Sequence, residues 1–296
     1  MDVVRAKAAR IMEYVTSLGA NAVSISFAFY TGGPSSDSLH PGEETPSPDR
    51  VAAVVAVAHA RGLHVTLRPL LDERILQPDK WRGVIDPADR AGWFASYQRF
   101  LVPYLRMAQR AGAERFTIGC ELTSMEADPR WTGLAAAARR LYQGELSYSA
   151  NWASYAEQAP PVPVRAGLDA YFPTTLADDA STDQVEAAWE DWFSSIRHRI
   201  DYRELVLDEV GIAAEQGAYR HPYQWGTGSL PLSTTVQERW MTAAGRFARR
   251  HKLAGIYYWK LSFHADPRHP EITNSDRGEF IGRPAADAVR ACFQQL

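Results

Sequence analysis

The sequence predicts an α/β fold of the (β/α)8 TIM barrel class, organised as one domain over residues 1–296. Three observations support this prediction. Short apolar runs alternate with amphipathic helical segments, which is typical of parallel α/β proteins. The length of 296 residues suits one barrel, which usually needs about 250 residues. No linker or change in composition divides the chain, so nothing indicates a second domain.

Seven segments have the apolar character of buried parallel strands. They are Ala22–Phe29, His64–Leu70, Arg115–Gly119, Leu146–Ala150, Leu168–Tyr171, Leu205–Glu209 and Ile256–Trp259. A closed barrel begins with a strand, whereas this sequence begins with a helical pattern. We therefore expect the first barrel strand to be missing from the chain.

The segments between these strands carry apolar residues at helical spacing. They predict helices over Val3–Leu18, Pro48–Gly62, Arg90–Arg110, Trp131–Tyr142, Gln184–Arg199 and Val236–His251, and from Pro284 onward. Ser47 is placed to cap the second of these helices, and Gly19 and Gly62 are placed to close the first two. The tryptophans on helices are expected in the core; they are Trp131, Trp189, Trp192 and Trp240.

Composition excludes several classes of function. The formal net charge is −3 and no basic stripe is present, which argues against a nucleic-acid partner. The sequence contains no run of 18 apolar residues, so no membrane span is predicted, and its first residues do not form a signal-peptide pattern. The chain is therefore expected to be cytoplasmic as written, or secreted if a segment precedes it. Nothing in the composition indicates an oligomeric state.

No cofactor and no metal are expected. A glycine-rich phosphate loop does not follow any predicted strand, and no Gly-x-Ser-x-Gly elbow is present. The histidines do not have metal-ligand spacing, and the loop His264–His269 is expected to shape a cleft rim. The two cysteines, Cys120 and Cys292, form no disulfide framework, and Cys120 is expected to be a small buried residue.

Two glutamates end predicted strands. Glu121 ends the run Phe116–Glu121, and Glu209 ends the run Leu205–Glu209. Active sites of barrel enzymes lie at the carboxyl ends of the strands, and glycosidases use a pair of carboxyl groups. A glutamate in such a place can also cap a helix or pair with a cation. The pair nevertheless makes a glycosidase the leading hypothesis.

The two glutamates need different protonation states. An acid/base residue must hold a proton, and a hydrophobic setting together with the charge of Glu209 would raise the pKa of Glu121. A nucleophile must stay ionised. Arg68 and Tyr171, both at predicted strand ends, are expected to donate hydrogen bonds to Glu209 and to keep it charged.

Aromatic side chains near the expected top face fit a sugar-binding cleft, because sugar rings stack on indole and phenol rings. The candidates, in or beside loops, are Trp81, Trp152, Trp225 and Trp259. Asn151 either binds a sugar hydroxyl or caps a loop, and Trp81 with Arg82 either lines a subsite or pins its loop. Trp259 either carries the reacting sugar or packs in the core.

Three further carboxylates are assigned no chemistry. Asp208 neighbours Glu209 but points to the other side of its strand, so we expect a structural role. Glu126 and Asp128 lie in a predicted loop and are expected to be solvated.

Nine segments, in this order and spacing, carry a resemblance to a known family. They are Gly19–Val23, Ala58–His64, Leu67–Pro69, Trp81–Gly83, Trp93–Tyr97, Phe116–Leu122, Tyr148–Trp152, Asp208–Gly211 and Gly282–Ala285. From about Leu18 to Pro284 the chain resembles glycoside hydrolase family 113, whose known members are retaining enzymes of the β-mannanase type.

The resemblance implies a residue-by-residue assignment. Glu121 would follow barrel strand four and act as acid/base, Glu209 would follow strand seven and act as nucleophile, and the missing strand would be the first. This chain departs from the family at two positions: Arg68 stands where a lysine is usual, and Cys120 where a small hydroxyl residue is usual.

The sequence thus predicts a retaining glycoside hydrolase that cleaves a β-linked polysaccharide or oligosaccharide by double displacement. Mannan is the first guess for the substrate, and no cofactor is required. Two alternatives stay open. A carbohydrate-binding barrel without activity would bind glycans but not cleave them, and a transglycosylase would use the same two glutamates while excluding water.

Overall fold

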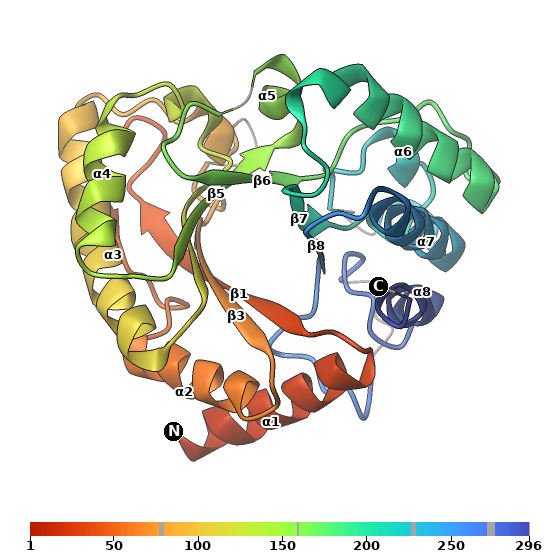
Figure 1. The fold of residues 1–296 in the computed structure, drawn as a ribbon, viewed down its shortest axis with the longest axis horizontal. Coiled ribbons are helices and arrows are strands. Elements are labelled where there is room, and N and C mark those ends of the chain that lie inside the picture. Colours follow the sequence, from red (N-terminus) through yellow and green to blue (C-terminus); the bar gives the residue numbers. More distant parts are fainter. Residues whose placement is uncertain (77–79, 159, 226–228, 271–275, 296) are drawn as a thin grey trace. The chain divides into compact units, whose positions relative to one another are not determined.

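The computed structural model describes residues 1–296 except 77–79, 159, 226–228, 271–275 and 296. Strands and helices alternate along the chain (Figure 1). The chain forms two compact units, and each is described by itself. The first comprises Met1–Ala6 and Asn21–Gly167, and the second comprises Lys7–Ala20 and Leu168–Leu296.

The sheet of the first unit has the strand order β2-β1-β3-β4-β5. Its strands are β1 (Ala22–Thr31), β2 (Leu39–His40), β3 (His64–Leu71), β4 (Arg115–Cys120) and β5 (Glu145–Asn151). β2 pairs antiparallel with β1, and the other neighbours pair in parallel. Every residue of β4 is buried, including the polar residues Arg115 and Thr117, as is typical of a parallel strand that is covered on both faces.

The helices α2 (Pro48–His59), α3 (Arg90–Ala111) and α4 (Arg130–Arg139) lie along one face of this sheet (Figure 1). The unit also contains the short helix α5 (Trp152–Glu157) and the 3₁₀ turns η1 (Arg82–Val84) and η2 (Thr123–Met125). The Ser47 hydroxyl accepts a hydrogen bond from the Arg50 amide at 3.4 Å, so the predicted cap of α2 is confirmed. The aromatic stripe of α3 faces the sheet, where Tyr97 stacks on Phe29 with ring centroids 5.2 Å apart.

The second unit contains the parallel strands β6, β7 and β8, paired in that order. Its strands are β6 (Arg165–Asp169), which begins in the first unit, β7 (Val206–Val210) and β8 (Gly255–Tyr258). Its helices are α1 (Asp2–Ser17), which belongs to this unit from Lys7 onward, α6 (Thr182–Ile196), α7 (Thr234–His251) and α8 (Pro284–Phe293), with the 3₁₀ turns η3 (Arg197–Arg199) and η4 (Ala218–Arg220).

Aromatic rings fill the core of the second unit. Trp189 and Trp240 are fully buried, and their ring centroids lie 5.2 Å apart. Phe172, just after β6, stacks on Trp192 at 4.5 Å with an angle of 7° between the rings. The predicted core positions of the helical tryptophans are thus confirmed, including Trp131 in the first unit, although Trp192 is only partly buried.

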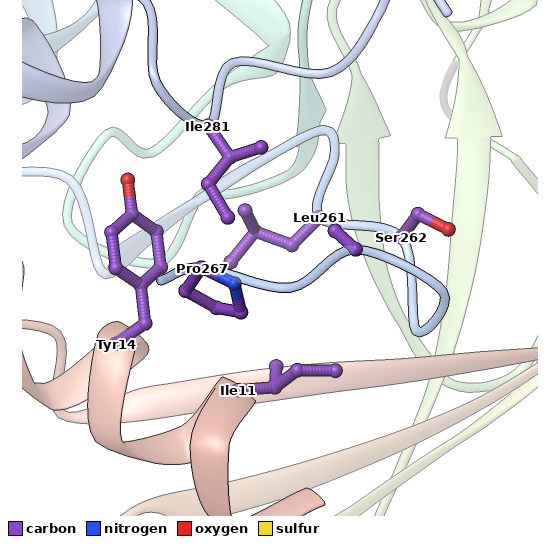
Figure 2. Close-up of a pocket in the computed structure, with 7 residues that line it drawn as sticks. Ile11, Tyr14, Leu261, Ser262, Pro267 and Ile281 are labelled. Carbon is purple, nitrogen blue, oxygen red and sulfur yellow. The ribbon is translucent and has the colours of Figure 1, made fainter. Parts of the chain in front are cut away.

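A small, shallow apolar pocket lies between α1 and the segment that follows β8. Ile11 and Tyr14 line it from the helix, and Leu261, Pro267 and Ile281 line it from the other side (Figure 2). None of the residues singled out as catalytic or sugar-binding candidates lines this pocket, so it belongs to the packing of α1 and not to the candidate site.

All seven predicted strands are present, with ends that differ by up to three residues. The largest difference is at β6, which spans Arg165–Asp169 instead of Leu168–Tyr171, because Phe172 packs against α6 rather than extending the sheet. Two short elements, β2 and α5, were not predicted. Among the described residues no helix is both long and apolar enough to cross a bilayer. The assignment of residues 1–296 to one domain stays a prediction.

Candidate active site

Glu121 directly follows β4 at the carboxyl end of the first unit's sheet. Its backbone has φ of 51°, in the left-handed region that a non-glycine residue rarely occupies and that costs on the order of 1 kcal/mol. The amide of Glu121 donates a hydrogen bond to the Ser149 carbonyl at 2.8 Å, which holds this turn against β5. The side chain is therefore directed by a fixed backbone and not by a flexible loop.

Asn151 orients the carboxylate of Glu121. Its amide nitrogen donates a hydrogen bond to Glu121 Oε1 at 2.8 Å. Its amide oxygen accepts from the Ala153 backbone at 2.9 Å and so caps α5. Because the cap uses the oxygen, the nitrogen must face Glu121. The sequence left hydroxyl binding and capping open as alternatives for Asn151, and the cap is confirmed, although it belongs to a helix rather than a loop.

Arg82 approaches the other oxygen of the same carboxylate. Its guanidinium lies 3.5 Å from Glu121 Oε2 and 2.9 Å from Glu73 Oε1, and the guanidinium is largely buried. The neighbouring Trp81 folds its ring over Gly83, where an added Cβ would lie 2.3 Å from the indole. Trp81 therefore pins its own turn, while its partial exposure still permits contact with a ligand.

Arg68 lies on β3 with 1% of its surface exposed. Its Nη2 donates hydrogen bonds to Cys120 Sγ at 2.8 Å and to Ser149 Oγ at 3.2 Å. The guanidinium thus reaches across β4 to β5, close to the residue that precedes Glu121. The expected hydrogen bond from Arg68 to Glu209 stays a prediction, because those two residues belong to different units.

Glu209 lies in β7 of the second unit and is 5% exposed. The strand continues to Val210, so Glu209 is the penultimate residue of the strand and not its last one. The Tyr171 hydroxyl donates a hydrogen bond to Glu209 Oε2, as predicted. Glu209 lies opposite Asp169 in the β6–β7 register, and its carbonyl accepts from the Ala170 amide at 2.8 Å.

Two tryptophans flank this half of the site. Trp225 is 40% exposed and meets Tyr171 edge to face, with centroids 5.2 Å apart. An added Cβ on Gly211 would lie 3.1 Å from the Trp225 ring, so this glycine makes room for the indole. Trp259 follows β8 and is partly exposed, and its amide donates to the Val210 carbonyl at 2.8 Å.

One expectation about this region is wrong. Glu126 and Asp128 are buried, with 3% and 8% exposed, and not solvated. The turn η2 folds the segment after Glu121 back onto the protein, where Asp128 pairs with Arg130 at 3.0 Å. Trp152, expected in or beside a loop, is the first residue of α5. The run Leu122–Met125, apolar at both ends, was the one sequence signal for this folded-back turn.

The pKa of Glu126 is raised from its ordinary value of 4.5 to about 7, mainly by burial and to a smaller extent by the negative charge of Glu121. The hydroxyls of Tyr148 and Ser154 act in the opposite direction by donating hydrogen bonds to the carboxylate. Burial also raises the pKa of Tyr148 well above its ordinary value, so this phenol keeps its proton. Sequence reasoning assigned a role to neither Glu126 nor Tyr148.

The candidate residues thus form two sets. Glu121 is held by Asn151 and Arg82 in the first unit, and Glu209 is held by Tyr171 in the second.

Comparisons with solved structures define the fold. A GH113 β-1,4-mannanase structure matches with a TM-score of 0.82 and 18% identity, over 98% of this chain and 93% of that one. GH5_18 from Streptomyces cattleya in complex with GlcNAc matches with a TM-score of 0.57 and 15% identity, over 99% and 74%. The fold is that of the (β/α)8-barrel glycoside hydrolases, as the sequence predicted.

A third structure, the GH113 β-mannanase AaManA from Alicyclobacillus acidocaldarius in complex with ManMIm, is 25% identical, with a TM-score of 0.76 over 99% of this chain and 92% of that one. The model of Glycoside Hydrolase Family 113 matches residues 3–278, and the chain belongs to this family. A search of curated proteins found no match. Family membership makes the protein a glycoside hydrolase and its substrate a carbohydrate.

Proposed function

We propose that the protein is a retaining β-glycosidase that cleaves β-linked mannan or its oligosaccharides, with Glu121 as acid/base and Glu209 as nucleophile. One observation carries this proposal. Each glutamate is buried at the carboxyl end of a parallel strand, and each accepts a hydrogen bond from a neighbouring side chain, Asn151 for Glu121 and Tyr171 for Glu209. A hydrogen bond of this kind fixes the direction in which a carboxylate acts.

The relatives support mannan as the substrate. The 25% identical structure is a β-mannanase in complex with ManMIm, and a second similar structure is a β-1,4-mannanase. The partly exposed indoles of Trp81, Trp225 and Trp259 are suited to stack against sugar rings. Asn151 and Arg68 would contact the hydroxyl groups of the reacting sugar.

The proposed reaction has two steps. In the first, Glu209 attacks the anomeric carbon while Glu121 gives its proton to the glycosidic oxygen, so the leaving sugar departs and a glycosyl ester forms on Glu209. In the second, the Glu121 carboxylate takes a proton from water, and that water attacks the anomeric carbon and releases Glu209. Two displacements at one carbon return the original β configuration.

Tyr171 would contribute to the first step. A phenol that donates to a carboxylate favours its ionised form, which a nucleophile requires. The same hydrogen bond loses strength as the carboxylate charge is lost on forming the new ester. Tyr171 therefore orients the nucleophile through a hydrogen bond from a neutral phenol.

Turnover of β-mannan and of aryl β-mannosides tests the proposal. Glu121→Ala and Glu209→Ala should each lower kcat by at least about 10²-fold on unactivated mannan. Glu145→Ala serves as the matched control, because Glu145 is exposed at the opposite end of β5 and pairs with Arg165 at the surface; it should retain activity. Glycan binding without cleavage, or transfer to acceptors without hydrolysis, would contradict the proposal.

A further inference from the structure

Glu126 is a buried carboxyl group that the proposed two-glutamate reaction does not use. It is the residue after η2, and 3% of its surface is exposed. Burying a carboxyl group costs free energy of folding unless hydrogen-bond donors compensate for the lost water. Its contacts show which parts of the candidate site it touches.

Tyr148 connects Glu126 to the backbone beside Glu121. The Tyr148 hydroxyl donates to Glu126 Oε1 at 2.9 Å and accepts from the Leu122 amide at 2.8 Å. A phenol has one proton, so the donation to Glu126 directs its lone pair to Leu122. Leu122 directly follows Glu121, whose left-handed backbone needs such support.

Ser154 connects Glu126 to the residue that orients the Glu121 carboxylate. The Ser154 hydroxyl lies 3.5 Å from Glu126 Oε1 and 3.1 Å from the Asn151 carbonyl oxygen. Asn151 in turn donates to Glu121 Oε1 at 2.8 Å. The contacts therefore close a ring that starts at Glu121 and returns to it, with Glu126 at its far side.

We propose that Glu126 is a positioning residue for Glu121. Glu126 holds Tyr148, which contacts the Leu122 backbone, and Ser154, which contacts Asn151, and both neighbours direct the Glu121 carboxylate. The charge of Glu126 also favours the protonated form of Glu121. The inference rests on the proposed function, because a protonated Glu121 matters only if this residue acts as the acid. Electrostatic coupling between two groups is reciprocal, so each charge raises the proton affinity of the other.

The titration of Glu126 supports this role. Its pKa of about 7 reflects burial, and the groups that face it are Tyr148 from β5, Ser154 from α5 and Glu121 after β4. Two nearby cations, Arg90 at the start of α3 and Arg130 at the start of α4, pair with Asp128. As Glu126 ionises near neutral pH, it adds a negative charge that opposes ionisation of Glu121.

The direct test is the titration of Glu121 itself, followed by NMR in protein labelled with ¹³C at the glutamate carboxyl groups. The Glu121 signal is assigned from its loss in Glu121→Gln. Glu126→Gln keeps Oε1 as an acceptor for Tyr148 and Ser154 but removes the charge. The Glu121 midpoint should move to lower pH by several tenths of a unit or more. An unchanged midpoint would overturn the charge part of the proposal whether or not the protein hydrolyses mannan.

Activity supplies the second readout. In Glu126→Gln the alkaline limb of the kcat/KM profile should move to lower pH by the same amount as the midpoint. Tyr148→Phe should lower kcat about tenfold or more with KM within twofold, because it releases the backbone beside Glu121. Asp128→Asn is the matched control: it is buried in the same segment but lies outside the ring, and it should leave the limb in place.

The outcomes separate the two proposals. Loss of activity in Glu121→Ala together with an unshifted profile in Glu126→Gln and normal kcat in Tyr148→Phe would contradict the positioning role alone. A wild-type protein without turnover on any glycan, but with the expected shift of the Glu121 midpoint, would contradict the proposed function and leave the coupling established.

Discussion

Arg68 donates a hydrogen bond to the sulfur of Cys120, with Nη2 and Sγ 2.8 Å apart. Both side chains are almost fully buried, with 1% and 2% exposed, and they lie on the adjacent strands β3 and β4. These are the two positions at which the sequence departs from the pattern of the family it resembles. Their contact shows that the two departures form one interaction, which lies directly before Glu121 in the chain.

A double-mutant cycle should reveal this coupling. Arg68→Lys keeps the charge but removes the Nη2 donor that reaches both Cys120 and Ser149. Cys120→Ser replaces the sulfur acceptor by a smaller hydroxyl oxygen on a shorter bond. We expect each change to destabilise the protein and the double variant to recover part of the loss, with a coupling free energy of about 0.5–3 kcal/mol. Urea denaturation measures it, and strictly additive effects would contradict a direct interaction.

The raised pKa of Glu126 makes stability depend on pH. Folding favours its protonated form, so its contribution is complete below the ordinary value of 4.5 and is lost as the pH rises through about 7. Glu126→Gln removes this dependence. The variant should gain stability relative to wild type between pH 5 and pH 8, by at most about 3 kcal/mol. Thermal unfolding over this range checks it; a constant difference would show that Glu126 does not titrate there.

The Asn151 side chain caps α5 through its oxygen and donates to Glu121 through its nitrogen, and a substitution can separate these two interactions. Asn151→Asp keeps an oxygen that can cap α5, so Tm should stay close to that of wild type, but it replaces the donor to Glu121 by a second carboxylate. We expect kcat/KM to fall about 10- to 100-fold, because this corresponds to the free energy that a hydrogen bond to a charged group contributes. Retained activity in a variant of normal Tm would show that the Glu121 contact is dispensable.

Trp225 and Trp240 provide a contrast between binding and packing. Trp225 is 40% exposed next to Tyr171, whereas Trp240 is fully buried. Trp225→Ala should raise KM for mannooligosaccharides severalfold with a small change in Tm. Trp240→Ala should cost about 3–5 kcal/mol of stability. Steady-state kinetics and thermal unfolding measure both, and an unchanged KM in Trp225→Ala would remove this indole from the sugar site.

The strands and both glutamates could be predicted because their signals are local. The buried part of β4 from Phe116 to Cys120 carries no charged residue, and Glu121 marks the point where that run ends. The burial of Glu126 and the capping role of Asn151 could not be predicted, because each depends on a short turn or helix. A polar residue after a strand is solvated unless the chain turns back, and the turn η2 that buries Glu126 has only three residues. Likewise α5 has six residues, too few to show helical periodicity.

The central claim is that Glu209 is the nucleophile and Glu121 the acid/base of one retaining reaction. The most direct measurement is the anomeric configuration of the azide products formed from an activated aryl β-mannoside. In Glu209→Ala, azide should attack the substrate itself and give the α-mannosyl azide. In Glu121→Ala, azide should attack the glycosyl-enzyme and give the β-mannosyl azide. No rescue in either variant, or the opposite anomers, would contradict the assignment.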